Sequence, residues 1–422
     1  MMRIITTIVL LIVTPACLFA QADSGKLLAQ AKAEMKKIRS GEQPDYVAAG
    51  KMLEDVVKKD PNNAEAWYYY GCALDRYNHK DGEAIAKSQE SLTENTGLAF
   101  ENCLHLCNDK YNGDILLLDP HTKLLAAWGA QALYYDLNNN RDSVEYCLKQ
   151  AAQRGGINRT VATYFRQVLD ECGRGGYLFT TGDMYTYYLL YLQKIERYRP
   201  DVTCIDLNLL NTQWYPEWLR SKNSVTFNYA GDELGKVKNI RWDATKATIP
   251  NRNPAYGDTS IYWMLKPSQN DLLLRSDQLL LDILQNIAFT KPVYFSGDVP
   301  SNMKLFLDDY LQCKGLTYRL LPVKDATSDI ELVSRLQRLP VLSSEPPGYL
   351  NNRDNIQVLN NYRFAYTTAA INASRSGHPE EALEFIETAE KKYPEELLPF
   401  FADATKKWFE NLKAKAANNE KL

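Results

Sequence analysis

Apolar residues recur every three or four positions in several stretches of the chain, a spacing that predicts amphipathic helices. The clearest examples are residues 46–58 and 64–74, which are separated by a Pro-Asn-Asn turn. The same pattern returns at 124–152 and at 369–394, where a turn rich in Asn or Gly again divides two helical stretches. Helices paired in this way are typical of repeat proteins, in which each unit buries its apolar face against the next.

A different pattern fills the middle of the chain, where short runs of β-branched and aromatic residues alternate with longer apolar stretches. The short runs predict strands at 177–181, 201–207, 292–296 and 316–322. The longer stretches predict helices at 184–195, 214–219, 277–287 and 303–313. This alternation predicts a small parallel or mixed sheet covered by helices. The expected fold class is therefore α plus α/β, with helical repeats flanking a small α/β domain.

These patterns divide the chain into consecutive parts. We expect a signal peptide at 1–20, helical repeats at 24–174, an α/β domain at 175–325, a linker at 326–360 and a carboxy-terminal helical repeat at 361–416. The last repeat cannot bury its own apolar face, so it should dock on the sheet domain or on the amino-terminal helices. We expect docking to bury most of Phe364, Leu383, Phe385 and Ile386.

The amino-terminal residues predict export. Arg3 precedes an apolar run at 4–13 that is too short to span a bilayer, and small residues follow it. Two processing routes stay open, namely cleavage after Ala20 and lipidation at Cys17. Thr14 is a poor match for the bulky residue that lipidation needs, which favours cleavage. The expected location is the periplasm or the outer membrane, and no later stretch is apolar for long enough to cross a membrane.

Composition narrows the classes of partner. The 422 residues are 45% hydrophobic and 24% charged, as in ordinary globular proteins, and the formal net charge is −3. A chain without a basic excess lacks the electrostatic attraction that nucleic-acid binding requires, so we set that partner aside.

The cysteines give no sign of a metal or disulfide framework. Of the eight cysteines, seven remain without Cys17, and an odd number cannot form a complete internal set of disulfides. Cys103, His105 and Cys107 are close in sequence, but they lack the C-x-x-C spacing and a second ligand pair. We therefore expect no metal and no cofactor.

The segment 64–74 resembles the first helix of a tetratricopeptide repeat, W-x-x-L-G-x-x-Y. Trp67, Tyr70, Gly71 and Leu74 stand at the positions of that motif. The partner helix is expected at 84–92. Such repeats imply a stack whose curved inner face takes a peptide or a partner helix.

Tyrosine is unusually frequent, with 27 tyrosines against 13 phenylalanines. Its apolar ring and polar tip suit both packing between helices and a polar ligand surface. Half-buried packing is the favoured interpretation. Tyr68, Tyr69 and Trp128 are nevertheless candidates for the surface on which a partner would bind.

The first and third predicted strands end in the same Gly-Asp step, at Asp183 and Asp298. Ligands of open α/β sheets bind at the carboxyl ends of strands, so these acids are candidate ligand-binding residues, together with Tyr185, Thr186 and Asp206. Alternatively each Asp caps the helix that follows it. Capping is the favoured interpretation because it needs only one residue.

The stretch 179–193, FTTGDMYTYYLLYLQ, is similar to a motif, G-D-N-D-T-Y-P-L-W-Y-L-Q, of a bacterial family of multi-spanning membrane proteins. That family is protein O-mannosyltransferase-like, and the motif lies in its soluble carboxy-terminal part. Further blocks resemble the same family at 199–202, 206–215, 275–279, 291–295 and 307–323. The resemblance covers roughly residues 175 to 400.

The resemblance implies an envelope-facing accessory domain without the membrane-embedded half, which carries the lipid-linked sugar chemistry. Met184 and Tyr185 replace the Asn and second Asp of the motif. The loss of an acid argues against retained chemistry at this position.

The sequence contains no nucleophile, zinc or phosphate-loop motif, so an enzyme is the less favoured interpretation. We expect an exported repeat protein that binds a protein or peptide partner, or acts as a scaffold, in the cell envelope. It would be accessory to protein glycosylation. The alternative is a carbohydrate-binding or carbohydrate-active domain whose site lies at the sheet edge near Asp183 and Asp298.

Overall fold

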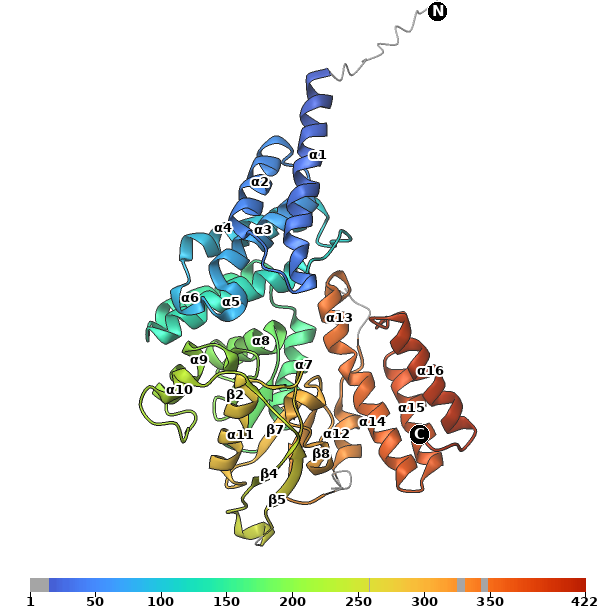
Figure 1. Cartoon of the computed structure of the whole chain (residues 1–422). Helices are drawn as coiled ribbons and strands as arrows, with labels where there is room; N and C mark the ends of the chain where they lie inside the picture. Colours follow the sequence, from blue (N-terminus) through green and yellow to red (C-terminus); the bar gives the residue numbers. More distant parts are fainter. Residues whose placement is uncertain (1–14, 258, 325–330, 343–347) are drawn as a thin grey trace, which may run out of the picture.

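A computed structural model describes residues 15–257, 259–324, 331–342 and 348–422. Figure 1 shows three regions: helices α1–α6 at one end, a sheet with its covering helices beneath them, and helices α13–α16 along one side. The predicted leader at 1–20 lies largely outside the described residues. No helix in the described ranges is both long enough and apolar enough to cross a membrane.

The amino-terminal helices follow one another closely, and each packs against the next. They are α1 (Pro15–Lys36), α2 (Tyr46–Lys59), α3 (Ala64–His79), α4 (Glu90–Leu106), α5 (Pro120–Leu137) and α6 (Arg141–Gln153). Polar residues in the turns start several of them. The side chains of Asp45, Asn63 and Asn140 each accept a hydrogen bond from a backbone N–H in the first turn of the next helix.

The helix predicted at 84–92 is wrong. A short 3₁₀ turn, η3 (Ile85–Lys87), occupies this place, and α4 begins only at Glu90. The Asn78 side chain explains the difference. Its oxygen accepts a hydrogen bond from Gln89 N at 2.9 Å and its amide donates to Gln89 O at 3.2 Å, which holds Gln89 in an extended conformation.

The central sheet is mixed, with strand order β2-β1-β7-β9-β8. Its strands are β1 (Tyr177–Thr180), β2 (Thr203–Asp206), β7 (Val293–Ser296), β8 (Leu311–Cys313) and β9 (Thr317–Leu320). β1 runs parallel to β2 and β7, and β9 runs antiparallel to β7 and β8. Every residue of β1 and β7 is buried, as expected for the centre of a covered sheet.

Helices connect and cover these strands. α7 (Arg159–Asp170) leads into β1, α8 (Asp183–Lys194) joins β1 to β2, and α11 (Arg275–Ile287) precedes β7. The insertion between β2 and α11 holds the remaining elements of this region: α9 (Trp214–Ser221), α10 (Glu233–Lys236), β3 (Ile240–Arg241), β4 (Thr245–Ile249), β5 (Ile261–Leu265) and β6 (Leu272–Leu273). β4 pairs with β5 and β3 with β6, both antiparallel. Neither pair was expected from the sequence.

The helix predicted at 303–313 is also wrong. The segment forms two 3₁₀ turns, η6 (Ser301–Lys304) and η7 (Asp308–Tyr310), followed by β8. Leu305 and Phe306 between them have φ angles of 55° and 58°, which an α-helix cannot contain. Trp263 holds this bend, because its indole N–H donates to Leu305 O at 2.7 Å.

The carboxy-terminal region contains α12 (Leu332–Arg338), α13 (Arg353–Leu359), α14 (Asn361–Arg375), α15 (Pro379–Lys392) and α16 (Asp403–Ala417). α12 and α13 lie within the stretch expected to be a linker, and Leu332 and Leu359 are buried in the main core. These helices dock on the rest of the molecule. The Tyr362 hydroxyl donates to Gln167 Oε1 of α7 at 2.6 Å.

The sequence predicts this docking, but its prediction of which side chains become buried is only partly confirmed. Ile386 is fully buried, whereas Phe364, Leu383 and Phe385 are half-buried. Phe364 instead lies at the outer edge of the helices, against the rings of Phe401 and Trp408.

Candidate functional site

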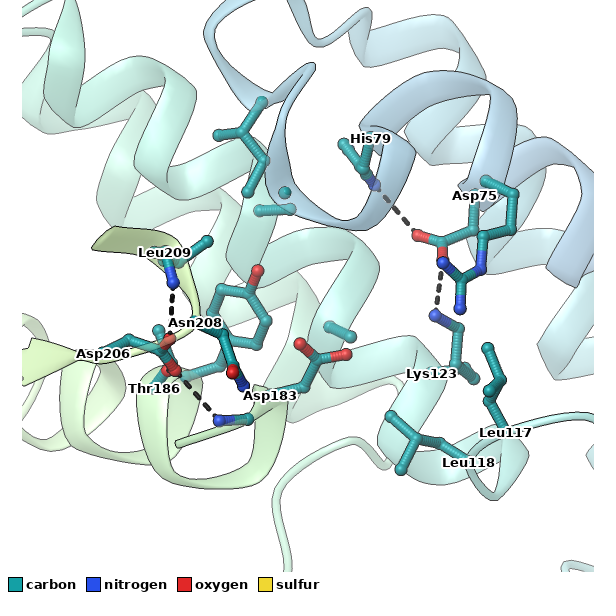
Figure 2. Close-up of a pocket in the computed structure, with 17 residues that line it drawn as sticks. Asp75, His79, Leu117, Leu118, Lys123, Asp183, Thr186, Asp206, Asn208 and Leu209 are labelled. Carbon is teal, nitrogen blue, oxygen red and sulfur yellow. Dashed lines mark hydrogen bonds and ion pairs between the residues drawn. The ribbon is translucent and has the colours of Figure 1, made fainter. Parts of the chain in front are cut away.

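A cavity of about 410 Å³ lies where the amino-terminal helices meet the sheet. One wall comes from α3 and α5, and the other comes from the residues that follow β1 and β2 (Figure 2). Its size is within the range of about 300–1,000 Å³ that is usual for small-molecule sites. The carboxyl ends of parallel strands supply the second wall, which is where open α/β sheets commonly bind ligands.

Asp206, the last residue of β2, organises the sheet wall. Its Oδ2 accepts hydrogen bonds from Gly182 N at 3.0 Å and from the Thr186 hydroxyl at 2.6 Å. Its Oδ1 accepts one from Leu209 N at 2.8 Å. Burial raises the pKa of Asp206, although the hydrogen bonds from Thr186 and Leu209 oppose the shift. The two carboxylate oxygens therefore hold together the turn after β1 and the turn after β2.

Asp183, the first residue of α8, lines the same wall. In Figure 2 its carboxylate lies between Asn208 on one side and Lys123 on the other. No hydrogen bond from the described residues reaches it. Burial raises the pKa of Asp183, and the positive charge of Lys123 partly offsets that effect. Asp183 is thus an acceptor that the cavity leaves open.

The helix wall carries a buried polar chain. Lys123 of α5 donates a hydrogen bond to Asp75 of α3, and His79 Nδ1 lies 2.9 Å from the other oxygen of Asp75. His79 Nε2 contacts the Ser88 hydroxyl at 3.0 Å, and that hydroxyl donates to Gln131 Oε1 at 2.6 Å. These side chains fix one another in place.

Within this row of side chains, the charges of Asp75 and Lys123 strongly affect each other's pKa. Burial would raise the pKa of Asp75, but the charge of Lys123 and the bond to His79 hold it well below its usual range. Burial would lower the pKa of Lys123, but Asp75 and Asp183 raise it. Lys123 therefore presents a charged ammonium group inside the molecule.

Asp298 and Tyr185 do not belong to this cavity. The Ser296 hydroxyl donates to Asp298 at 2.6 Å, and Tyr185 pairs with the hydroxyl of Tyr164 at 2.7 Å. Burial raises the pKa of Asp298 to about 6. Tyr185 faces α7, whereas Asp183 and Thr186 face the cavity, so the expected shared site of Asp183 and Asp298 does not form.

The capping interpretation is wrong as well. Gly182 occupies the N-cap of α8 and makes no side-chain cap, and Asp183 is already the first helical residue. Asp298 is followed by a 3₁₀ turn whose N-cap is Pro300. Asp183 still lies in the first turn of α8, where a negative charge complements the helix dipole.

The candidates for the repeat surface are buried. Tyr68, Tyr69 and Trp128 are all fully inaccessible to solvent. The Tyr68 hydroxyl donates to Leu118 O at 2.8 Å, and the Tyr69 hydroxyl donates to Asp114 at 2.9 Å. The Trp128 indole lies against Gly97 of α4. These side chains pack between helices and offer no surface to a partner.

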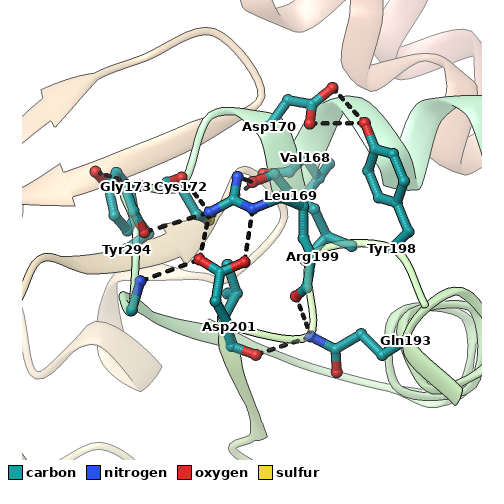
Figure 3. Close-up of polar contacts among 12 residues, drawn as sticks. Val168, Leu169, Asp170, Cys172, Gly173, Gln193, Tyr198, Arg199, Asp201 and Tyr294 are labelled. Atoms are coloured by element: carbon teal, nitrogen blue, oxygen red, sulfur yellow. Dashed lines mark hydrogen bonds and ion pairs between the residues drawn. The ribbon is translucent and has the colours of Figure 1, made fainter.

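The segment 199–202, which matches the R-x-D-V block, lies at the other end of the strands (Figure 3). Arg199 donates to Leu169 O at 2.8 Å and to Cys172 O at 2.9 Å, and it pairs with Asp201. Asp201 also accepts from Gly175 N at 3.1 Å, and the hydrogen bond from Arg199 lowers its pKa. This motif fixes the end of α7 to the start of the sheet and has a structural role.

Sequence reasoning missed the helix wall. Asp75 and His79 are four residues apart on one helix, a spacing that places them on the same face and could have been noticed. The sequence pattern points less clearly to Lys123 as a site residue, because it is a single charged residue in an apolar helix. No group of three or more His, Cys, Asp or Glu within the described ranges could hold a metal ion.

A family model described as TMEM260-associated domain 2 matches residues 161–228 and 243–337. A comparison with curated proteins finds no match for the chain. The matched segments include the sheet wall, with Asp183, Thr186 and Asp206, and exclude the helix wall, with Asp75 and Lys123. The part of the chain that carries α7, the central sheet and α12 is therefore similar to a TMEM260-associated domain, and the cavity lies at its border with the amino-terminal helices.

Proposed function

We propose that this chain is an exported binding and scaffolding module of the cell envelope, accessory to protein glycosylation. The observation that carries the proposal is the cavity between the helix wall and the sheet wall. A ligand in this cavity would contact both parts of the molecule at once. The matched family is linked to TMEM260, which is associated with protein O-mannosyl transfer, and this supports a role beside glycosylation.

The proposal includes tetratricopeptide-type repeats in α1–α6 and in α14–α15. Gly71 supports it, because a Cβ atom at this position would come within 2.8 Å of the Phe100 ring of α4. Helices that approach so closely need a glycine, and the repeat motif has one here. Because Tyr68 and Tyr69 are buried, the proposal assigns binding to the cavity and not to the surface of the helices.

Binding explains the site better than catalysis does. Hydrolysis of a sugar bond commonly needs two carboxyl groups that are free to act on the substrate. Asp206 is fully engaged in holding two turns, and Asp75 is engaged by Lys123 and His79. Asp183 is the one carboxylate of the cavity lining without a hydrogen bond from the described residues.

Site-specific photo-crosslinking tests this proposal. A photo-reactive amino acid at Leu117, a partly exposed residue of the cavity lining, should link the chain to one defined envelope component in intact cells. The matched control carries the same photo-reactive amino acid at Val341, which is 68% exposed and does not line the cavity. Mass spectrometry then identifies the linked species.

The decisive comparison uses Asp183→Asn in the Leu117 background. We expect the cross-link to weaken strongly, because the substitution alters the open acceptor and leaves the fold intact. An equal yield from Leu117 and Val341, or a yield that Asp183→Asn does not change, would refute a partner at this cavity.

A further inference from the structure

We infer that the cavity binds a saccharide ring, with Asp183 and Lys123 contacting neighbouring hydroxyl groups. The inference rests on the proposed function and names the ligand class of the same site. Its basis is the placement of hydrogen-bonding groups, apolar side chains and charges around one cavity.

Acceptors and donors both face the cavity. The Asp183 carboxylate accepts no hydrogen bond from the described residues. Asn208 donates its amide to the Thr181 hydroxyl at 2.7 Å, which leaves its carbonyl oxygen as a second acceptor. Lys123 has three N–H donors, and its hydrogen bond to Asp75 occupies one of them. Sugar hydroxyls can donate to the acceptors and accept from the lysine.

Apolar side chains form another part of the lining. Ile85, Leu117 and Leu118 contribute to it, as do Ala126 and Leu209. A pyranose ring has hydroxyls along its edge and C–H groups on its faces, so it needs polar groups at one side and apolar contact at the other. The cavity provides that combination, as small-molecule sites generally do.

The charges around the cavity favour a neutral ligand. Asp75, Asp183 and Asp206 stand against Arg76 and Lys123, an excess of a single negative charge, and Asp75 is already paired with Lys123. An anion such as phosphate would face three carboxylates, and an ammonium group would face Arg76 and Lys123 as well as the carboxylates. Buried charges without partners are costly, whereas hydroxyl groups are satisfied by either sign.

Asp75 and His79 act through Lys123 as positioning residues. The ion pair with Asp75 keeps the ammonium group of Lys123 charged and holds it in place at the cavity. Ser88 and Gln131 hold His79 from behind. The helix wall is thereby preorganised, which lowers the entropic cost of binding.

Isothermal titration and saturation-transfer NMR of the mature chain test this inference. The probes are methyl glycosides of mannose, galactose and glucose, with inorganic phosphate and lysine methyl ester as charged comparisons. We expect at least one glycoside to bind, and its affinity to fall about tenfold or more in Asp183→Asn, because a hydrogen bond to a charged group is lost. Asn208→Ala should also weaken binding, whereas Asp298→Asn, outside the cavity, should not.

Asp183 makes no hydrogen bond to the described residues, so the Asn variant should fold, and circular dichroism checks this. Binding of phosphate or the lysine ester in place of the glycosides would overturn the inference. So would equal glycoside affinity in Asp183→Asn, or no binding of any probe. If cross-linking at Leu117 succeeds while every glycoside fails, the ligand class is wrong and the proposed function stands.

Discussion

Asp206 and Asp183, two aspartates that line the same wall of the cavity, show how differently one residue type can be used. Asp206 accepts three hydrogen bonds and joins the turns after β1 and β2. Asp183 accepts none from the described residues and faces the cavity. The first is a structural residue of the site, and the second is its open functional group.

This contrast predicts that Asp206→Asn lowers the stability of the fold, whereas Asp183→Asn does not. Asp206→Asn places an amide NH₂ where a carboxylate oxygen accepts, so at least one backbone or hydroxyl donor loses its partner. We expect the free energy of unfolding to fall by about 1–3 kcal/mol. Asp183→Asn removes a buried charge whose pKa is already raised, so stability at pH 7 should stay equal or rise slightly.

Urea denaturation followed by circular dichroism measures both variants. A loss of stability in Asp183→Asn as large as that in Asp206→Asn would mean that both acids are structural, and the cavity would then lack its open acceptor.

At the scale of the element, the contact between α5 and α8 depends on one glycine. Gly129 lies so close to Tyr187 that a Cβ atom would come 2.9 Å from the Tyr187 Cβ and overlap its ring. Tyr187 is buried and lines the cavity, so it cannot turn away freely. The helix wall and the sheet wall are held together at this contact.

Gly129→Ala should therefore destabilise the chain by about 1–3 kcal/mol, because overpacking outweighs the better helix propensity of alanine. Gly50→Ala in α2 is the control, since its nearest neighbour would be the Ala73 Cβ at 3.9 Å. That variant should be neutral or up to about 1 kcal/mol more stable. Thermal unfolding of both variants tests this prediction. If Gly129→Ala is as stable as the wild type, α5 and α8 can move apart without loss of stability.

The elements that could be predicted are those whose own sequence determines them. The strands near 177–181 and 292–296 and the helices near 184–195 and 277–287 have clear periodicity and appear as expected. The predictions are wrong where a side chain from another part of the chain determines the backbone conformation. Asn78 holds Gln89 extended, and Trp263 holds the bend at Leu305, and neither contact is visible in the local pattern.

The same reasoning explains the partial prediction of the site. Asp183, Thr186 and Asp206 lie at the carboxyl ends of β1 and β2, the edge of the sheet where the sequence predicts ligand-binding residues. Asp298 follows the neighbouring strand β7, but it bonds to Ser296 and does not line the cavity. Lys123 could not be found from sequence, because its role depends on the way α5 packs beside the sheet.

At the scale of the whole molecule, the amino-terminal and carboxy-terminal helices meet at two buried acids. Asp119 starts α5, and its backbone N–H donates to the carboxylate of Asp354 in α13 at 2.8 Å. The amide of Asn352 donates to the Thr122 hydroxyl at 3.2 Å beside them. Burial raises the pKa of Asp119 to about 6, with His121 opposing and Asp354 adding to the shift. Burial likewise raises the pKa of Asp354, and Arg353 and Lys123 oppose it.

This junction predicts a pH dependence with a definite sign. Because the folded-state pKa of Asp119 lies above the unfolded value of about 4, the folded state binds more protons between pH 4 and 6. This contribution to stability is complete below pH 4 and is lost as the pH rises towards 6. Asp354→Asn keeps an oxygen for the Asp119 N–H and removes one charge, so it should reduce this loss.

The measurement is the urea midpoint of the wild type and of Asp354→Asn at pH 4.5 and pH 7. The exposed Asp55→Asn of α2 is the control, and its pH response should match the wild type. If Asp354→Asn keeps the full wild-type difference between the two pH values, the junction does not titrate as described.

The two walls of the cavity differ in their relation to known proteins. The sheet wall lies within the segments that match a TMEM260-associated domain, and the helix wall lies outside them. During evolution, recombination or drift in the helices could therefore remodel half of the cavity while the sheet edge stayed unchanged. Chimeras that exchange residues 24–153 between related chains would inherit the selectivity of whichever chain donated the helices.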